Sequence, residues 1–371
     1  MLGVLEMAGK GSGFLRRREA SYLPSPGDVH VGERVIRQFG LRSGDEIDGS
    51  VRAAAKGKSP SLETVTSVLG RPPASLGERP EFTTLSAVHP NEQIMLEGGN
   101  PAGQTDFTNR VIDLLCPLGK GQRALIVAPA KAGKTMVLRA IAEGLNQNYP
   151  SADLFILLVD ERPEEVFEME AAGVGEVVAS SFDNPAQRHV ALAELTLERA
   201  RRRVELGQDV VLIVDSLTRL ARAYNTVEKG TGRTLSGGLD AQSLERPKRF
   251  LGSARRIDPS QGGGSLTIIA TALVDTGSKM DQVIFEEFKG TGNSELVLSR
   301  ELAERRVYPA IDLVASATRR EELLLSEEAL AASRALRGRF AGMTPINAMN
   351  DLLTDLRRNK TNAELIRSLA D

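Results

Sequence analysis

After about residue 120, the apolar residues of this chain form short uninterrupted runs. Each run has the length of a β-strand, and continuous apolar character is typical of strands that are buried on both faces. Segments at 161–170 and 189–205 lie between the runs and place apolar residues at helical spacing. The runs occupy residues 124–128, 154–159, 177–179, 210–214 and 266–270. This alternation predicts an α/β fold, a parallel sheet covered by helices.

The first 70 residues follow a different pattern. Short strand candidates at 4–7, 13–16, 29–31 and 47–52 are separated by clusters of Gly, Pro, Ser and Asp. Short strands at close spacing predict a small β-barrel, and an OB or cold-shock barrel matches the size. The segment holds ten Lys+Arg and eight Asp+Glu. This near balance leaves a purely structural barrel open beside an RNA-binding one.

Proline and glycine without clear periodicity mark residues 71–105, which we interpret as an extended connector. The predicted organisation is therefore multidomain. Residues 1–70 form the barrel, 71–105 the connector, and 106–371 the α/β domain.

Composition removes several classes of function. The 371 residues carry a net charge of −2, which neither indicates nor excludes a nucleic-acid partner. One cysteine and three histidines cannot build a disulfide framework or a Cys/His metal cluster. No apolar run approaches the ~20 residues of a membrane helix, and the N-terminus lacks the pattern of a signal peptide. We expect a cytoplasmic protein with no membrane partner.

A phosphate-binding loop joins the first run to the helix that follows. Backbone N–H groups and a helix N-terminus face an anion in such a loop, while the lysine reaches the β/γ-phosphates and the hydroxyl holds Mg²⁺. The strand–loop–helix context favours this interpretation over a chance Gly-Lys-Thr. The consensus opens with Gly, whereas this loop opens with Ala. Its residues are Ala128, Pro129, Ala130, Lys131, Ala132, Gly133, Lys134 and Thr135.

Two other runs end in carboxylates at the same edge of the predicted sheet. Asp215 follows the run 210–214, as a Walker B aspartate that supports the metal opposite Thr135. Glu161 follows the run 154–159, and we choose it as the group that orients and deprotonates water. Acids at a helix N-terminus also serve capping and the helix dipole, which is the favoured interpretation of Glu164 and Glu165.

Several segments of the chain together resemble one protein family. The segments 128–135, 159–166 and 215–225 resemble those of bacterial transcription termination factor Rho, as do 246–250, 268–272, 275–280 and 286–293. The similarity covers nearly the whole chain and accounts for Ala128, because Rho phosphate loops open without Gly. It implies a cold-shock-like barrel joined to a RecA-like P-loop ATPase domain.

The resemblance implies a ring-shaped homohexamer that hydrolyses ATP with Mg²⁺ between subunits and pulls single-stranded RNA through its centre. It assigns the binding of phosphates and metal to Lys131, Lys134 and Thr135, and it places Arg162 in the same pocket. It assigns the contact with adenine to Tyr308, beside Met136. Arg319 matches an arginine finger that reaches a neighbour's γ-phosphate, and Arg306 matches a second interface arginine. Without the resemblance, both would be interpreted as solvated surface arginines.

The resemblance also places RNA contacts. In the barrel these are Phe14, Arg16 and Asp28; in two pore loops they are Arg233 and Ser236, and Thr276, Gly277, Ser278 and Lys279. The barrel departs from the family, because Ser12, His30 and Pro60 stand where aromatic residues are usual. Since stacking contributes ~1–3 kcal/mol per base, we expect weakened or altered RNA capture.

These features predict an RNA-stimulated ATPase that moves 5′ to 3′ and terminates transcription, with RNA polymerase and elongation factors as further partners. One alternative is a rotary or secretion-type hexameric ATPase. Another is an RNA-binding regulatory ring with little turnover. ATPase activity that ignores RNA would favour the first, and a near-zero rate at saturating RNA the second. The sequence does not determine the target transcripts or whether the ring is open.

Overall fold

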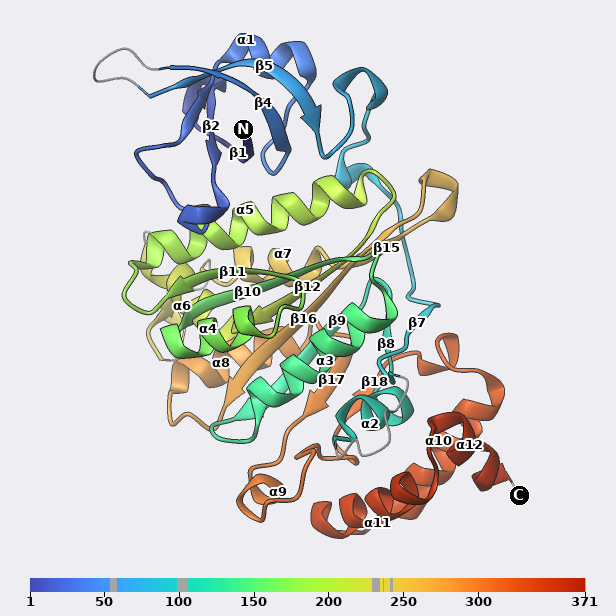
Figure 1. The fold of residues 1–371 in the computed structure, drawn as a ribbon. Helices are drawn as coiled ribbons and strands as arrows, with labels where there is room; N and C mark the ends of the chain where they lie inside the picture. Colours follow the sequence, from blue (N-terminus) through green and yellow to red (C-terminus); the bar gives the residue numbers. More distant parts are fainter. Residues whose placement is uncertain (54–58, 99–105, 229–233, 236, 241–242, 371) are drawn as a thin grey trace.

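The computed structural model describes residues 1–53, 59–98, 106–228, 234–235, 237–240 and 243–370. A small barrel lies above a large α/β domain, and helix α5 (Ala186–Val204) runs between them (Figure 1). This arrangement confirms the predicted multidomain fold.

The N-terminal barrel is closed by five strands in the order β1-β2-β3-β5-β4. Inward-facing apolar residues such as Leu5, Leu15, Val29 and Ile47 are fully buried and fill it. Strand β5 and helix α1 were not predicted, because β5 has only two buried positions and several polar ones. The elements are β1 (Leu2–Met7), β2 (Gly13–Arg16), β3 (Val29–Val31), α1 (Glu33–Phe39), β4 (Glu46–Arg52) and β5 (Ser61–Val68).

A nine-stranded sheet, counted over the described residues, forms the centre of the second domain. All five predicted runs are strands in it: β9 (Arg123–Pro129), β10 (Asp153–Glu161), β11 (Glu176–Ser181), β12 (Asp209–Asp215) and β16 (Ser265–Val274). They pair in parallel in the order β11-β10-β12-β16-β9, and β17 (Ser294–Val297) continues parallel to β9. The shorter strands β18 (Ala317–Thr318), β15 (Arg255–Ile257) and β6 (Ala87–Val88) pair antiparallel.

Helices cover both faces of this sheet, so the parallel strands are buried on both sides. They are α3 (Lys134–Asn148), α4 (Pro163–Ala171), α5, α6 (Leu217–Val227), α7 (Glu245–Gly252) and α8 (Lys279–Lys289). Since the strands run in parallel, the loops before α3, α4 and α6 all leave from one edge of the sheet. The phosphate loop and both predicted carboxylates therefore share that edge.

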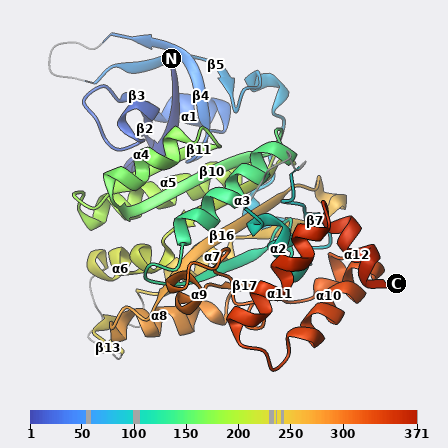
Figure 2. The same ribbon diagram turned by 60° about the horizontal axis from the view of Figure 1, so that its bottom comes forward.

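The remaining elements pack around the domain, and the last three helices form a group at the C-terminus (Figure 2). These elements are β7 (Gln93–Ile94), α2 (Thr108–Leu115), β8 (Leu118–Gly119), β13 (Thr234–Leu235), β14 (Leu239–Asp240), α9 (Arg300–Glu304), α10 (Glu327–Phe340), α11 (Pro345–Arg358) and α12 (Asn362–Ala370). Over the described ranges, every helix is too short or too polar to cross a membrane.

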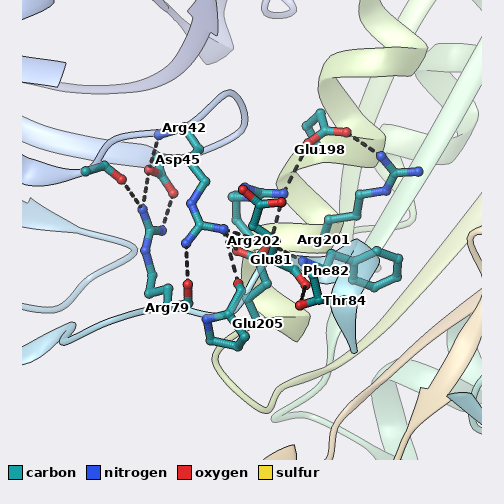
Figure 3. A network of polar contacts seen from close by, with 12 residues as sticks. Arg42, Asp45, Arg79, Glu81, Phe82, Thr84, Glu198, Arg201, Arg202 and Glu205 are labelled. Carbon is teal, nitrogen blue, oxygen red and sulfur yellow. Dashed lines mark hydrogen bonds and ion pairs between the residues drawn. The ribbon is translucent and has the colours of Figure 1, made fainter. Parts of the chain in front are cut away.

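Buried ion pairs fasten the barrel and the segment after it to the end of α5 (Figure 3). Arg79 donates two hydrogen bonds to Asp45, at 2.5 and 2.8 Å, and both side chains are almost inaccessible to solvent. Arg42 contacts Glu205 at 3.3 Å, and Glu205 also accepts the backbone N–H of Phe82 at 2.8 Å. The barrel is thus held on the α/β domain by specific polar contacts.

Candidate nucleotide site and RNA interface

The phosphate loop connects the buried strand β9 to helix α3. Lys131 and Gly133 adopt positive φ angles of 65° and 87°, and these turn the backbone between strand and helix. Lys134 is the first residue of the 15-residue helix α3. The N-terminus of such a helix presents free N–H groups and partial positive charge, which suits an anion such as phosphate.

Below the loop, Lys134 joins the two predicted carboxylates. Its Nζ atom donates to Asp215 Oδ1 at 2.6 Å and to Glu161 Oε1 at 3.1 Å. Thr271 of β16 donates a second hydrogen bond to Asp215 Oδ1, at 2.7 Å. Burial lowers the pKa of the Lys134 ammonium, but the charges of Asp215 and Glu161 raise it above its ordinary value. Lys134 therefore stays protonated between the two acids.

Glu161 is only 1% exposed at the end of β10. Burial raises the pKa of its carboxyl, and the negative charge of Asp215 raises it further, whereas Lys134 and Arg219 oppose the change. A carboxylate with a raised pKa is a stronger base toward water. This environment suits the predicted role.

Two residues that the sequence analysis did not single out hold this strand end. Asp160 has a positive φ of 57°, which is uncommon outside glycine, and the register with β11 shifts between Val159 and Glu161. Arg219 of α6 donates to the carbonyl oxygen of Asp160 and lies 3.5 Å from Glu161 Oε1. The sequence signal that could have identified Arg219 is its position on the first helical turn after Asp215 and Ser216.

The acidic residues at this edge fit a magnesium ion. Glu161, Glu165 and Asp215 each offer a carboxylate oxygen, and the three atoms lie within 4.8 Å of one another. Carboxylate oxygens are the ligands that Mg²⁺ prefers, usually one or two together with substrate phosphates. Thr135, the other predicted ligand, is the second residue of α3. Glu165 was predicted as a capping residue and belongs to this group as well.

The predicted adenine-binding residues lie beside the loop. A Cβ atom built on Gly133 would lie 3.8 Å from Cε1 of Tyr308, so this ring borders the phosphate loop. Tyr308 is 36% exposed and Met136 is 58% exposed. Arg162 is exposed and immediately precedes α4. Two exposed apolar side chains beside a phosphate loop are suited to a flat base.

Arg319 lies at the opposite edge of the sheet from the phosphate loop. Its backbone N–H donates to the carbonyl oxygen of Asn293 at 2.9 Å, and Asn293 Oδ1 accepts the N–H of Arg123 at 2.9 Å. Arg123 is the first residue of β9, and the loop begins at the other end of that strand. A seven-residue strand spans roughly 20 Å, so Arg319 does not reach the phosphate loop of its own chain. Arg306 is also exposed, with a φ of 60°.

The predicted RNA residues of the barrel form one contiguous patch. The Phe14 ring lies edge-on to His30 with centroids 5.5 Å apart, and the Arg16 guanidinium lies 5.4 Å from the Phe14 centroid. Arg16 is ion-paired with the buried Asp28 and with Glu6. One aromatic face beside one cation suits a base and its phosphate.

The departures from the family lie in the same area. Ser12 directly precedes β2, and the backbone N–H of His30 donates to the carbonyl oxygen of Pro60 at 2.8 Å. His30 supplies the second ring beside Phe14. The patch therefore has a histidine and two non-aromatic residues at the three positions.

Local hydrogen bonds hold residues 276–279, the second predicted pore loop. Thr276 Oγ1 donates to Asp281 at 2.6 Å, and the Ser278 side chain accepts the N–H of Asp281 to cap α8. Gly277 and Lys279 line a surface hollow of about 420 Å³ with them. The first loop reaches the same place, because a Cβ atom on Gly237 would lie 2.6 Å from the backbone N of Met280. Arg233 and Ser236 lie outside the described residues.

Comparisons with known proteins match two parts of the chain to different family models. Residues 1–74 match the model of the Rho termination factor RNA-binding domain, and residues 108–318 match that of the ATP synthase alpha/beta family nucleotide-binding domain. Two solved ATPases of type III secretion systems have a similar fold. One, from pathogenic bacteria, has a TM-score of 0.61 and 25% identity over 85% of this chain and 92% of its own. EscN of enteropathogenic E. coli has a TM-score of 0.62 and 24% identity over 85% of this chain and 78% of its own.

The fold and site thus define a P-loop ATPase that carries an RNA-binding barrel. Curated relatives named transcription termination factor Rho are 52% identical in Haemophilus influenzae, over 98% of this chain and 86% of the relative, and 50% identical in Escherichia coli K12, over 99% and 87%. A relative from Gemmatimonas aurantiaca is 53% identical over 97% of this chain, which spans only 49% of that protein. This chain belongs to the Rho transcription termination factor family.

Proposed function

We propose that this chain is the subunit of a ring-shaped homohexamer that hydrolyses ATP and moves 5′ to 3′ along single-stranded RNA to terminate transcription. The observation that carries the proposal is the division of the site. Lys134, Glu161 and Asp215 meet below the phosphate loop, whereas Arg319 lies at the other end of β9. One chain therefore supplies only part of the site, and a neighbour completes it.

In the proposed site, Lys131 and Lys134 bind the phosphates, and Thr135 and Asp215 hold Mg²⁺. The metal neutralises charge on the phosphate oxygens. Glu161 Oε1 accepts a proton from the attacking water, and Arg219 and Lys134 keep that carboxylate in place. Tyr308 and Met136 contact the adenine, and Arg162 lies in the same pocket. The remaining loop residues, 128–130 and 132–133, contribute backbone N–H groups where they have them.

Arg319 of the neighbouring subunit is proposed to approach the γ-phosphate, with Arg306 at the same interface. Such fingers contribute ~10³–10⁵ in turnover, because they neutralise charge that develops in the transition state. This role explains why Arg319 is exposed and forms no ion pair within the part of the chain that the structure describes.

RNA is proposed to bind first on the barrel at Phe14, Arg16 and Asp28, and then in the pore at residues 276–279, with Arg233 and Ser236. One cation per subunit, repeated around a ring, grips the sugar–phosphate chain without sequence preference. RNA polymerase and elongation factors are proposed as partners, and the cytoplasm as the location.

An ATPase assay with and without single-stranded RNA tests the function. We expect RNA to stimulate turnover of the parent chain, and the Glu161→Gln and Arg319→Ala variants to lose it. Hydrolysis at full rate by a monomer without RNA would refute the proposal.

A secretion-type ATPase is the second candidate, and the similarity of fold to two such enzymes supports it. The barrel patch of Phe14, Arg16 and His30 favours the RNA-dependent enzyme instead. Turnover that is indifferent to RNA would favour the secretion type. A regulatory ring with little turnover would bind RNA and show almost no hydrolysis at saturation.

A further inference from the structure

Helix α4 has a high density of negative charge. Four of its nine residues are glutamates, at 164, 165, 168 and 170, and it contains no lysine or arginine. None of the four forms an ion pair within the described ranges, although the pKa of Arg139 on α3 is raised by its hydrogen bond to Glu143 and further by the negative charge of Glu168. Phe167 on the same helix is 69% exposed. An exposed aromatic side chain surrounded by charges has the composition of a protein contact.

The opposite edge of the sheet carries uncompensated positive charge. We define the basic edge as Arg123, Arg255, Lys289 and Arg319. Over the residues that the structure covers, none of these four is ion-paired. The Arg123 guanidinium donates to the carbonyl oxygens of Thr291 and Ala254, at 2.9 and 3.4 Å.

Backbone contacts hold the basic edge together. Asn293 links Arg319 to Arg123, and Ala254, which Arg123 contacts, directly precedes Arg255. Lys289 ends helix α8, two residues before Thr291. Burial lowers the pKa of Arg123, and the neighbouring charge of Arg319 lowers it further. Arg319 and Arg255 both lie close enough to Arg123 for their charges to repel it, which an acidic partner would relieve.

The two features cannot meet within one chain. Helix α4 follows the carboxyl end of β10, whereas Arg123 and Arg255 lie at the amino ends of β9 and β16, on the other side of the domain (Figure 1). A contact between different surfaces of identical chains is head-to-tail, and it forms a ring when its rotation closes. The charges are thus arranged for a second copy.

We propose that α4 of one subunit docks on the basic edge of its neighbour and places the arginine finger in the site. This inference rests on the proposed function. Because α4 begins only two residues after Glu161, any contact that brings the neighbour's Arg319 to Glu161 also brings the basic edge to α4. The exposed glutamates, Glu164, Glu168 and Glu170, then orient the incoming edge, while Phe167 is buried at the contact.

Charge exchange tests the proposal. The variants are Glu168→Lys on α4, Lys289→Glu on the basic edge, and the two combined. Both side chains are exposed and lie outside the proposed catalytic group. Glu78→Lys is the matched control, because it makes the same charge change at an exposed position in the segment after the barrel. Sedimentation velocity over a concentration series gives the assembly state, and circular dichroism checks folding.

We expect the parent and Glu78→Lys to assemble alike, each single variant at the interface to need about tenfold more protein to assemble, and the double variant to recover, because like charges at a contact are repulsive. Salt should weaken the parent ring, since the screening length falls from about 10 Å at 0.1 M to about 3 Å at 1 M.

Unchanged assembly of Glu168→Lys, or a double variant that does not recover, would overturn this interface and leave the proposed ring standing. If Lys289→Glu weakens RNA binding but not assembly, the basic edge is an RNA contact and the proposal fails. A parent chain that stays monomeric overturns the ring and the interface together.

Discussion

Lys134 Nζ lies 2.6 Å from Asp215 Oδ1 and 3.1 Å from Glu161 Oε1. One ammonium thus joins the ends of β10 and β12 to the start of α3. Two buried carboxylates this close would repel each other, and Lys134 compensates for that repulsion. The geometry fixes the two acids before substrate arrives, which is the preorganisation that electrostatic catalysis requires.

Glu161→Gln should abolish turnover while leaving nucleotide binding intact. The amide keeps the shape of the side chain but cannot accept a proton, and a general base contributes ~10²–10⁴ in rate. Steady-state hydrolysis and equilibrium binding of ATP measure the two effects. Glu78→Gln is the matched control, because Glu78 is exposed in the segment after the barrel and lies outside the proposed site and interface, and we expect a rate within about twofold of the parent. Equal losses in both variants would remove Glu161 from its role.

Mixing two inactive variants should restore part of the activity. In a mixed ring, an Arg319→Ala subunit keeps Glu161, and a Glu161→Gln neighbour keeps Arg319, so some interfaces are complete. ATPase assays after subunit exchange, compared with each variant alone, measure this complementation. Two Arg319→Ala preparations mixed together provide the control. Activity that never recovers would mean that Glu161 and Arg319 act in the same chain.

The barrel should show less preference for pyrimidines than a typical member of its family, because Ser12, His30 and Pro60 replace stacking residues. Filter binding to poly(C) and poly(A) measures the difference. His30→Tyr should strengthen poly(C) binding by up to the ~1–3 kcal/mol of one stacked base. Tight poly(C) binding by the parent chain that Phe14→Ala abolishes would contradict this prediction.

Arg79→Met should destabilise the attachment of the barrel. It leaves the buried Asp45 without its cation, and breaking a buried pair costs about 3–5 kcal/mol. Urea unfolding followed by circular dichroism gives the free energy of unfolding. Arg71→Met, at an exposed position of the same segment, should change it by no more than about 0.5 kcal/mol. A small effect at Arg79 would show that the ion pair contributes little net stability.

Asp113 should make stability depend on pH. Burial raises the pKa of this carboxyl to about 7, and the charge of Glu97 adds to the increase, although the N–H groups of Glu97 and Leu96 oppose it. The folded chain therefore holds this proton more tightly than the unfolded chain. Its contribution is complete below the ordinary pKa of 3.8 and is lost as the pH rises through about 7.

Urea unfolding at pH 5 and pH 8, with and without Asp113→Asn, measures this contribution. The parent should lose more stability between these pH values than the variant, because the amide is neutral at both. Each unit of pKa shift corresponds to about 1.4 kcal/mol. Identical pH profiles would show that Asp113 does not titrate in this range.

The sequence by itself determined the class of fold and the nucleotide side of the site. The signals lie within short segments: continuous apolar runs end in Asp215 and Glu161, and a loop ends in Lys134 and Thr135. Their meeting is predictable because parallel strands bring their carboxyl ends to one edge of the sheet. The barrel was predicted from short strands and turn residues, but β5 was not, since its residues lack an apolar run.

Only the tertiary structure decided which distant residues meet. Arg219 lies beside Glu161, and Glu165 joins the possible metal ligands, because α4 and α6 leave the same edge of the sheet. It also placed Arg319 at the far end of β9, next to Arg123. Local pattern fixes how a segment folds and which face it buries. The neighbours of an exposed charge depend on the packing of segments far apart in sequence. The local spacing of apolar residues therefore does not predict them.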